Sequence, residues 1–281
     1  MKRLIIQKLS TLLFLFVLTM FSASFPENIP VSSRPEQFKL AILMYHGFTK
    51  DGKESTYVIK MREFEKDIVY LKENGFTFVL PNDISDFINY GKIPGEKCVM
   101  ITLDDGYLNN YTFAYPILKK YDAKAVISPI ASLSDYHSIN PDNHTEYAHI
   151  TWDQISEMSE SGLVDFQNHS YNLHTFNSER KGSAKKEKES PQEYRRMFYE
   201  DLKKAHNAIK SATGKSPYVY VYPFGLKSGE MTSVLRCSGY KMSLGCESGY
   251  NILTGEKNEL WNMKRFNRSH ITDASQLLKD Y

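Results

Sequence analysis

Short apolar runs alternate along the chain with segments whose apolar residues recur at helical spacing. FKLAILMYHGF at 38–48 is typical of a strand, whereas Phe64, Ile68 and Leu71 recur at helical spacing within 61–75. The predicted strands cover residues 38–48, 76–80, 97–103, 123–130, 163–170, 218–225, 240–246 and 263–269. The predicted helices cover residues 61–75, 83–91, 111–121, 152–162, 191–214, 229–239 and 273–281.

This alternation indicates an α/β protein with a parallel sheet. The repeat count favours a distorted (β/α) barrel of about seven or eight strands over an open sheet, within one catalytic domain at 38–281. Two polar stretches interrupt the repeat and are predicted to be loops. They are SDYHSINPDNHTEYAH at 134–149 and the charge-dense SERKGSAKKEKES at 178–190.

The first residues form no part of the predicted domain. Lys2, Arg3 and Lys8 precede the uncharged run STLLFLFVLTMF, and small residues follow it. This order is typical of an export signal, and the apolar run is short for a membrane span. We therefore predict an export signal or N-terminal anchor at 1–25, a linker at 26–37, and a secreted or cell-surface protein.

Charge and cysteine content exclude some classes of partner and site. The net charge is +2, and removal of the signal with its three basic residues leaves −1, so nothing favours nucleic acid as a partner. The three cysteines include no C-x-x-C pair, which argues against a thiolate zinc site. Buried free thiols are expected, and a Cys237–Cys246 disulfide stays open.

Polar side chains stand where several predicted strands end. His46 follows the first strand, Asp104 and Asp105 end the strand in ITLDDGY, and His169 and His174 lie in NHSYNLH. In a barrel the loops after the strands meet at one rim and form the active site. These side chains are therefore expected to converge there.

The two histidines are five residues apart, which fits neither one helix face nor one strand face. The spacing fits a strand end followed by a turn that brings His174 back beside His169. Two imidazoles with one carboxylate leave a coordination position open, as in catalytic zinc sites. One aspartate would bind the metal, and its neighbour would stay free to act as the base that takes a proton from water, provided that the strand stops at Gly106.

TLDDGY, HSYNLH and YPFG together resemble three ordered motifs of the polysaccharide deacetylases, the NodB-like domain of carbohydrate esterase family 4. The resemblance covers residues 38 to 275. It implies a distorted (β/α) barrel, a divalent metal that is usually zinc, and removal of N-acetyl groups from N-acetylglucosamine-type polymers. The YH of LMYHGF further resembles the branch that acts on poly-N-acetylglucosamine and wall glycans.

The resemblance also implies residue roles. Asp104 corresponds to the general base, and Asp105, His169 and His174 to the metal ligands. Ser170 would orient a ligand by hydrogen bonding. The YPFG motif would line the sugar groove and offer backbone donors to the reacting oxygen; its residues are Tyr222, Pro223, Phe224 and Gly225.

The chain departs from the family pattern at several points. Many members carry an arginine before the proline of the third motif, paired with the catalytic aspartate, and Val221 stands there instead. The later Asp-Trp motif is not visible, and His270 lies two or three residues off the position of the usual acid. His46 is a candidate acid, a hydrogen-bonding rim residue or a structural residue. Trp152 is either a sugar-stacking or a core residue.

Three main hypotheses, one of them with a variant, compete on these residues. The first is an exported metal-dependent de-N-acetylase of an acetylated polysaccharide, with Zn²⁺ or another divalent transition metal as cofactor. The second is a catalytically impaired carbohydrate-binding relative, and an O-acetyl esterase acting on a xylan-type glycan also stays open. The third is a glycosidase, which needs two carboxyl groups about 5–10 Å apart across the scissile bond and would leave the histidines without a role.

Overall fold

The computed structural model describes residues 37–178 and 180–281. The predicted export signal or anchor at 1–25, and the predicted linker up to residue 36, lie outside this part of the chain. Among the helices that the structure describes, none is long and apolar enough to cross a bilayer.

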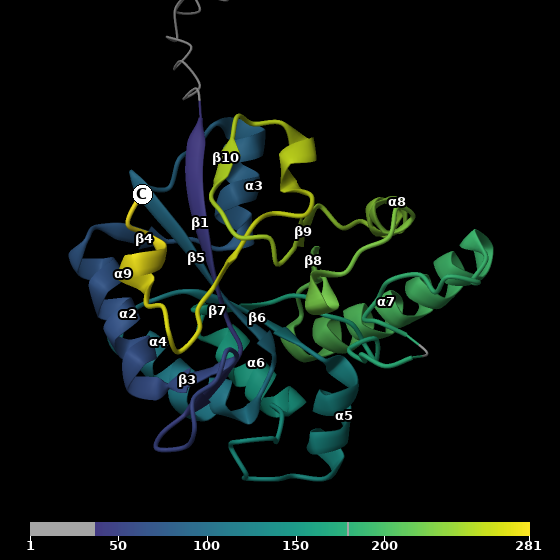
Figure 1. The fold of residues 1–281 in the computed structure, drawn as a ribbon, viewed down its shortest axis with the longest axis horizontal. Helices are drawn as coiled ribbons and strands as arrows, with labels where there is room; N and C mark the ends of the chain where they lie inside the picture. The colour runs from purple at the N-terminus through teal and green to yellow at the C-terminus, as the bar shows by residue number, and fades with distance from the viewer. Residues whose placement is uncertain (1–36, 179) are drawn as a thin grey trace, which may run out of the picture. The chain divides into compact units, whose positions relative to one another are not determined.

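Parallel strands form the centre of the fold (Figure 1). β5 (Lys97–Asp105) lies between β1 (Phe38–Tyr45) and β6 (Ala125–Pro129), and β7 (Val164–Phe166) follows β6. All of these pairs are parallel. β10 (Asn251–Leu253) pairs antiparallel with the first residues of β1, on the edge opposite to β5.

The parallel strands close into a ring. Asn168, just after β7, bridges to Tyr220 in β8 (Val219–Val221), which pairs with β9 (Met242–Leu244). Leu244 bridges to Met263, and the chain then enters β11 (Phe266–Asn267), which pairs with β1. Seven strands of the described chain thus form a distorted barrel, which confirms the predicted fold class.

The remaining elements complete the repeat. Figure 1 shows α2, α4 and α9 along one side of the central strands, with α7 and α8 on the other. The remaining elements are β2 (Gly47–Thr49), β3 (Val58–Lys60), β4 (Phe76–Phe78), α2 (Met61–Glu73), α3 (Pro81–Tyr90), η1 (Asn110–Ala114), α4 (Tyr115–Tyr121), α5 (Ala131–Ile139), α6 (Trp152–Glu160), α7 (Pro191–Thr213), η2 (Pro223–Gly225), α8 (Met231–Cys237), η3 (Lys257–Leu260) and α9 (Ala274–Leu277).

Alternation along β1 and β5 decides which side chains enter the barrel. Leu40 and Ile42 join Cys98 and Met100 in one buried cluster with residues of β8 and β9. The intervening positions of both strands pack against the helices in a second cluster. Because strand side chains alternate in direction, Asp104 has the same orientation as Met100 and faces the barrel interior.

The segment 134–149 was predicted to be a loop, and this is wrong for its first part. α5 begins at Ala131 and ends at Ile139. It buries only Ala131, Ser134 and His137, so its inner face carries no large apolar residue. The apolar periodicity that reveals a helix in a sequence is therefore missing here.

The cysteines are free among the described residues, as expected, but only Cys98 is buried. Cys237 and Cys246 are exposed. The expectation of buried thiols is therefore correct for one residue in the barrel wall and wrong for the other two.

Candidate active site

Both carboxylates at the end of β5 reach the same cavity. Asp105 and Gly106 each have a φ of 69°, so the chain leaves the strand in a left-handed turn. A β-carbon at Gly106 would lie 2.8 Å from the β-carbon of Pro129, which leaves room for glycine alone. The turn redirects Asp105, so two adjacent carboxylates line one cavity although strand neighbours otherwise point apart.

A tight turn brings the two histidines together. Ser170 has a φ of 152°, and its hydroxyl accepts a hydrogen bond from the Leu173 amide at 3.1 Å. The Asp201 carboxylate accepts the amides of Tyr171 and Asn172, both at 2.8 Å. The imidazole centroids of His169 and His174 lie 5.0 Å apart. Ser170 thus positions His174 through the turn.

Three potential ligand atoms converge on one point. Asp105 Oδ1 lies 3.3 Å from His169 Nε2 and 3.2 Å from His174 Nε2, and the three atoms lie within 4.8 Å of one another. His169 Nδ1 donates to the Val221 carbonyl oxygen at 2.8 Å, so in the neutral ring Nε2 offers a lone pair. Asp105 Oδ1 is buried and has no hydrogen bond within the described residues.

The protonation states of Asp105 and His174 agree with ligation. Burial and the neighbouring His169 together lower the pKa of His174 to about 4, so its ring is neutral at pH 7. Burial by itself would raise the pKa of Asp105, but the two imidazoles bring it below its usual value. Burial would lower the pKa of His169, but its hydrogen bond to Asp105 and the charges of Asp104 and Asp105 raise it, so a cation would have to displace a proton from this ring. A charged oxygen and two nitrogen lone pairs facing one point fit a divalent cation, and His₂Asp with an open position is a donor set of catalytic zinc.

Asp104 is held by an arginine that the sequence analysis missed. Arg265 Nη1 and Nη2 donate to the two carboxylate oxygens of Asp104, each at 2.8 Å, and Arg265 Nε donates to the Gly245 carbonyl at 2.7 Å. Arg265 is 0% exposed and Asp104 is 2% exposed. Burial would raise the pKa of Asp104, but the Arg265 and His169 charges lower it below its ordinary value. The carboxylate is therefore ionised and fixed in orientation.

Val221 stands where many family members carry an arginine, and Arg265, from the last strand segment of the ring, pairs with Asp104 instead. Arg265 enters from the strand segment that joins β9 to β1, 161 residues after Asp104. Val221 contributes differently, because its carbonyl orients His169. A sequence signal existed, since Arg265 lies two residues after the buried Met263 and therefore on the same strand face.

His46 lies on the same cavity. Its Nδ1 is buried without a hydrogen-bond partner among the described residues, and its ring meets the Tyr57 ring edge-on at 4.8 Å between centroids. Burial lowers the pKa of His46, while Asp104 and Asp105 oppose that shift. The cavity has a volume of about 470 Å³, and apart from Tyr57, which precedes β3, its lining residues come from the rims of six ring strands: Met44, His46, Asp104, Asp105, Tyr107, His169, His174, Tyr222, Phe224, Cys246 and Asn267.

The YPFG motif lies at the cavity edge, with Tyr222 and Phe224 in its lining. Phe224 has a φ of 58°, and its ring lies 4.3 Å from the His174 ring. The amides of Tyr222 and Gly225 donate to the backbone carbonyls of Leu244 and Tyr222. Those two amides are engaged within the protein, and Pro223 has no amide hydrogen.

Two other candidates lie away from the cavity. Trp152 begins α6, packs partly against the core, and donates from Nε1 to Asp135 at 2.8 Å. It therefore has a structural contact and does not line the catalytic cavity. His270 is exposed and does not line the cavity either.

Comparison with known families agrees with this geometry. The polysaccharide deacetylase family model matches residues 91–243, which is more than half of the chain. The chain belongs to the polysaccharide deacetylase family. The matched segment contains Asp104, Asp105, His169 and His174, whereas His46 and Arg265 lie outside it on either side.

Several relatives and solved structures resemble this polysaccharide deacetylase. YxkH of Bacillus subtilis (strain 168), named for the same family, is 30% identical over 75% of this chain and 66% of its own length. The poly-beta-1,6-N-acetyl-D-glucosamine N-deacetylase of Staphylococcus aureus (strain N315) is 26% identical over 88% of this chain and 86% of its own. The enzyme of that name from Escherichia coli (strain K12) is 26% identical, and the chain spans only 34% of its length.

The solved structures support the fold. The de-N-acetylase from Aggregatibacter actinomycetemcomitans superposes with a TM-score of 0.74 over 86% of this chain and 99% of that one, at 24% identity. IcaB from Ammonifex degensii superposes with a TM-score of 0.62 over 82% and 87% of the two chains, at 28% identity. The barrel described above is thus the fold of these deacetylases.

Proposed function

We propose that this member of the polysaccharide deacetylase family is an exported, metal-dependent de-N-acetylase that acts on N-acetylglucosamine polymers. One observation carries the proposal: the ligand atoms of Asp105, His169 and His174 converge beside Asp104, whose carboxylate is separately fixed by Arg265. Metal binding and proton transfer thus fall to different carboxylates in one cavity.

The metal would be held by Asp105, His169 and His174, and Zn²⁺ fits these ligands best. When bound, such a cation polarises the acetyl carbonyl and lowers the pKa of water. Asp104 accepts the proton of the attacking water, because Arg265 keeps its carboxylate ionised at neutral pH. Arg265 also prevents Asp104 from turning toward the metal ligands, since it engages both oxygens.

His46 completes the reaction in this proposal. The protonated His46 ring, which the Asp104 and Asp105 charges favour against the effect of burial, donates a proton to the amide nitrogen as the carbon–nitrogen bond breaks, which releases acetate and leaves a free amine on the sugar. The proton that Asp104 took from water then passes through solvent to His46, so both groups return to their starting states. Support comes from its place in the cavity wall and from its Nδ1, which has no other partner among the described residues.

The substrate and the location rest on the relatives and on the N-terminal sequence. The Staphylococcus aureus and Escherichia coli relatives are named for poly-β-1,6-N-acetyl-D-glucosamine, and we propose the same polymer as the substrate of this chain. The basic start and apolar run of residues 1–25 fit export, with cleavage or an N-terminal anchor as the two outcomes.

The test is acetate release by the purified zinc-loaded protein from a panel of acetylated glycans, together with its metal content. We expect release from N-acetylglucosamine oligomers, loss on chelation and recovery with zinc. Release from acetylated xylan alone would instead identify an O-acetyl esterase, and glycan binding without any release would identify an impaired relative. Reducing ends without acetate would indicate a glycosidase.

Four variants separate the roles. Asp104→Asn and His46→Gln should keep the metal and lose about 10²–10⁴-fold in kcat. Asp105→Asn and His174→Gln should lose the metal itself. His144→Gln is the matched control, because His144 is exposed and hydrogen-bonds to Asp142 outside the cavity. If Asp104→Asn stays near full activity, the assignment of the base is wrong.

A further inference from the structure

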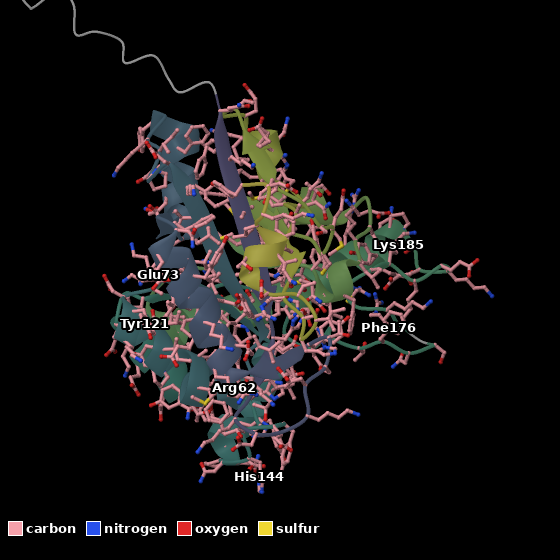
Figure 2. All side chains as sticks on the ribbon, turned by 60° about the vertical axis from the view of Figure 1, so that its left-hand side comes forward. Arg62, Glu73, Tyr121, His144, Phe176 and Lys185 are labelled. Atoms are coloured by element: carbon pink, nitrogen blue, oxygen red, sulfur yellow. The ribbon has the colours of Figure 1, made fainter. Side chains whose placement is uncertain are left out.

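Two exposed aromatic rings extend outward from the metal-ligand end of the cavity. Phe224 is 42% exposed and Phe176 is 62% exposed. Their centroids lie 5.4 Å apart at an angle of 76°, and Phe224 in turn lies against His174. Figure 2 shows Phe176 on a loop that projects from the body of the molecule on the same side as Lys185. A row of ring contacts thus leads from His174 through Phe224 to the exposed Phe176.

The loop that carries Phe176 is a built hairpin. Phe176 and Lys181 form an antiparallel bridge, and the Gly182 amide donates to the Thr175 carbonyl at 2.7 Å. Gly182 has a φ of 56°, and a β-carbon there would lie 2.8 Å from the Pro223 carbonyl oxygen. The hairpin is therefore packed directly against the YPFG motif, at a distance that only glycine permits.

An ion pair ties the returning side of this hairpin to the segment that follows it. Arg180 Nη2 lies 2.7 Å from Glu189 Oε1, and Arg180 Nη1 donates to the Ala184 carbonyl at 2.8 Å. Both charged side chains are largely buried, at 12% and 11% exposure. Arg180 and Glu189 thus tie together two points of the charge-dense segment that the sequence marked as a surface loop, and Phe176 lies just before that segment.

An exposed aromatic pair at the mouth of a cavity favours a flat, partly apolar ligand. A pyranose ring offers such a surface, since its C–H groups gather on its faces while its hydroxyls point outward. If the acetyl group being removed lies at Asp104, Phe224 contacts the sugar that carries it. The next sugar along the polymer then reaches Phe176.

We propose that Phe176 is a specificity-determining residue that stacks on the sugar adjacent to the one being deacetylated. This rests on the proposed function and deepens it, because it selects oligomers and polymers over a single N-acetylglucosamine. Phe176 takes no part in the chemistry. Its removal should therefore raise KM for chains and leave the reaction of small substrates unchanged.

The test compares Phe176→Ala, Phe176→Tyr and the wild type on N-acetylglucosamine and its oligomers of two to five units. Tyr90→Ala is the matched control, because Tyr90 is 80% exposed at the end of α3 and does not line the cavity. We expect Phe176→Ala to lower kcat/KM for oligomers about 3- to 10-fold through KM, with the monomer unchanged. Phe176→Tyr should restore the wild-type values.

Equal losses on monomer and oligomers, or no loss on oligomers, would overturn the role of Phe176. Its failure is distinguishable from failure of the proposed function. If the zinc-loaded wild type releases no acetate from any substrate, titration calorimetry of a pentamer against the wild type and Phe176→Ala still decides. Weaker binding by the variant alone supports the stacking role, and equal binding refutes it.

Discussion

Replacement of Arg265 by methionine tests whether the active site depends on the last strand of the ring. The change removes both hydrogen bonds to Asp104 and leaves a carboxylate that is 2% exposed without its counter-charge. Methionine keeps most of the side-chain length, so the loss is chiefly electrostatic.

The magnitude follows from the two contacts. Each hydrogen bond to a charged group is worth about 1.5–3 kcal/mol, which gives a loss of about 3–6 kcal/mol for the pair. Breaking a buried ion pair by removing one partner costs about 3–5 kcal/mol, in agreement with that figure. Against a total stability of about 5–15 kcal/mol, this loss is a large fraction, so the denaturation midpoint of the variant should be markedly lower.

The assay is urea unfolding of Arg265→Met, Asp104→Asn and the double variant, in parallel with acetate release. The double variant should be destabilised by less than the two single changes together, by at least about 1 kcal/mol, because it leaves no unpaired charge. Lys264→Met is the neighbouring control. Its side chain is 45% exposed and lies 3.7 Å from Glu247, so its unfolding free energy should change by less than about 1 kcal/mol.

Activity provides a second readout. Arg265 lowers the pKa of Asp104, so its loss raises that pKa, and a larger share of the base is protonated at a given pH. The acidic limb of the pH–rate profile should therefore move to higher pH. The same sign applies to stability, because a carboxylate with a lowered pKa stabilises the fold above its unfolded pKa and ceases to do so as pH falls. An Arg265→Met variant as stable and as active as Lys264→Met would refute the reasoning.

Two further predictions concern the anchoring of the C-terminal segment and of the histidine turn. Asp67→Asn should lower the free energy of unfolding in urea by about 3–5 kcal/mol, because the buried Arg268 charge loses the carboxylate that now lies 2.6 Å away. Glu65→Gln on the same helix is the control and should leave the midpoint near wild type. A small effect at Asp67 would show that this pair does not hold α9 to α2. Ser170→Ala should weaken zinc binding about 10- to 100-fold in a chelator competition, because the Leu173 amide loses its acceptor. Ser190→Ala, which removes the N-terminal cap of α7, is the control and should bind zinc normally. Equal zinc affinity of the two variants would contradict the role of the turn.

The sequence predicted the barrel because its strands and helices alternate with clear periodicity. The ring itself depends on single bridges, such as Asn168–Tyr220 and Leu244–Met263, which no local pattern reveals. α5 escaped notice because its buried face is made of small and polar residues. The type of an element was thus predictable where large apolar residues repeat at its spacing. It was not predictable for α5, whose buried face lacks such residues.

At the site, the sequence analysis predicted that five side chains lie at one rim, and all five line one cavity in the structure: His46, Asp104, Asp105, His169 and His174. Their motifs could be found because each follows an apolar strand. Arg265 could not be paired with Asp104 in this way, because the contact spans 161 residues and β11 has only two residues in strand pairing. Phe176 escaped notice because it lies between the histidine motif and the charge-dense segment, and its place beside Phe224 depends on the close contact of Gly182 with Pro223.

The late position of Arg265 in the chain has a consequence for synthesis. When a ribosome has made residues 1–250, both histidines and both aspartates have already emerged, yet the ring still lacks the segment between β9 and β1. A fragment that ends there contains every residue of the three recognisable motifs but has an unpaired carboxylate in place of an oriented base. In the proposed mechanism, hydrolysis therefore waits until the final strand docks, so unfinished chains and fragments that lack the C-terminal segment should release far less acetate than the full chain.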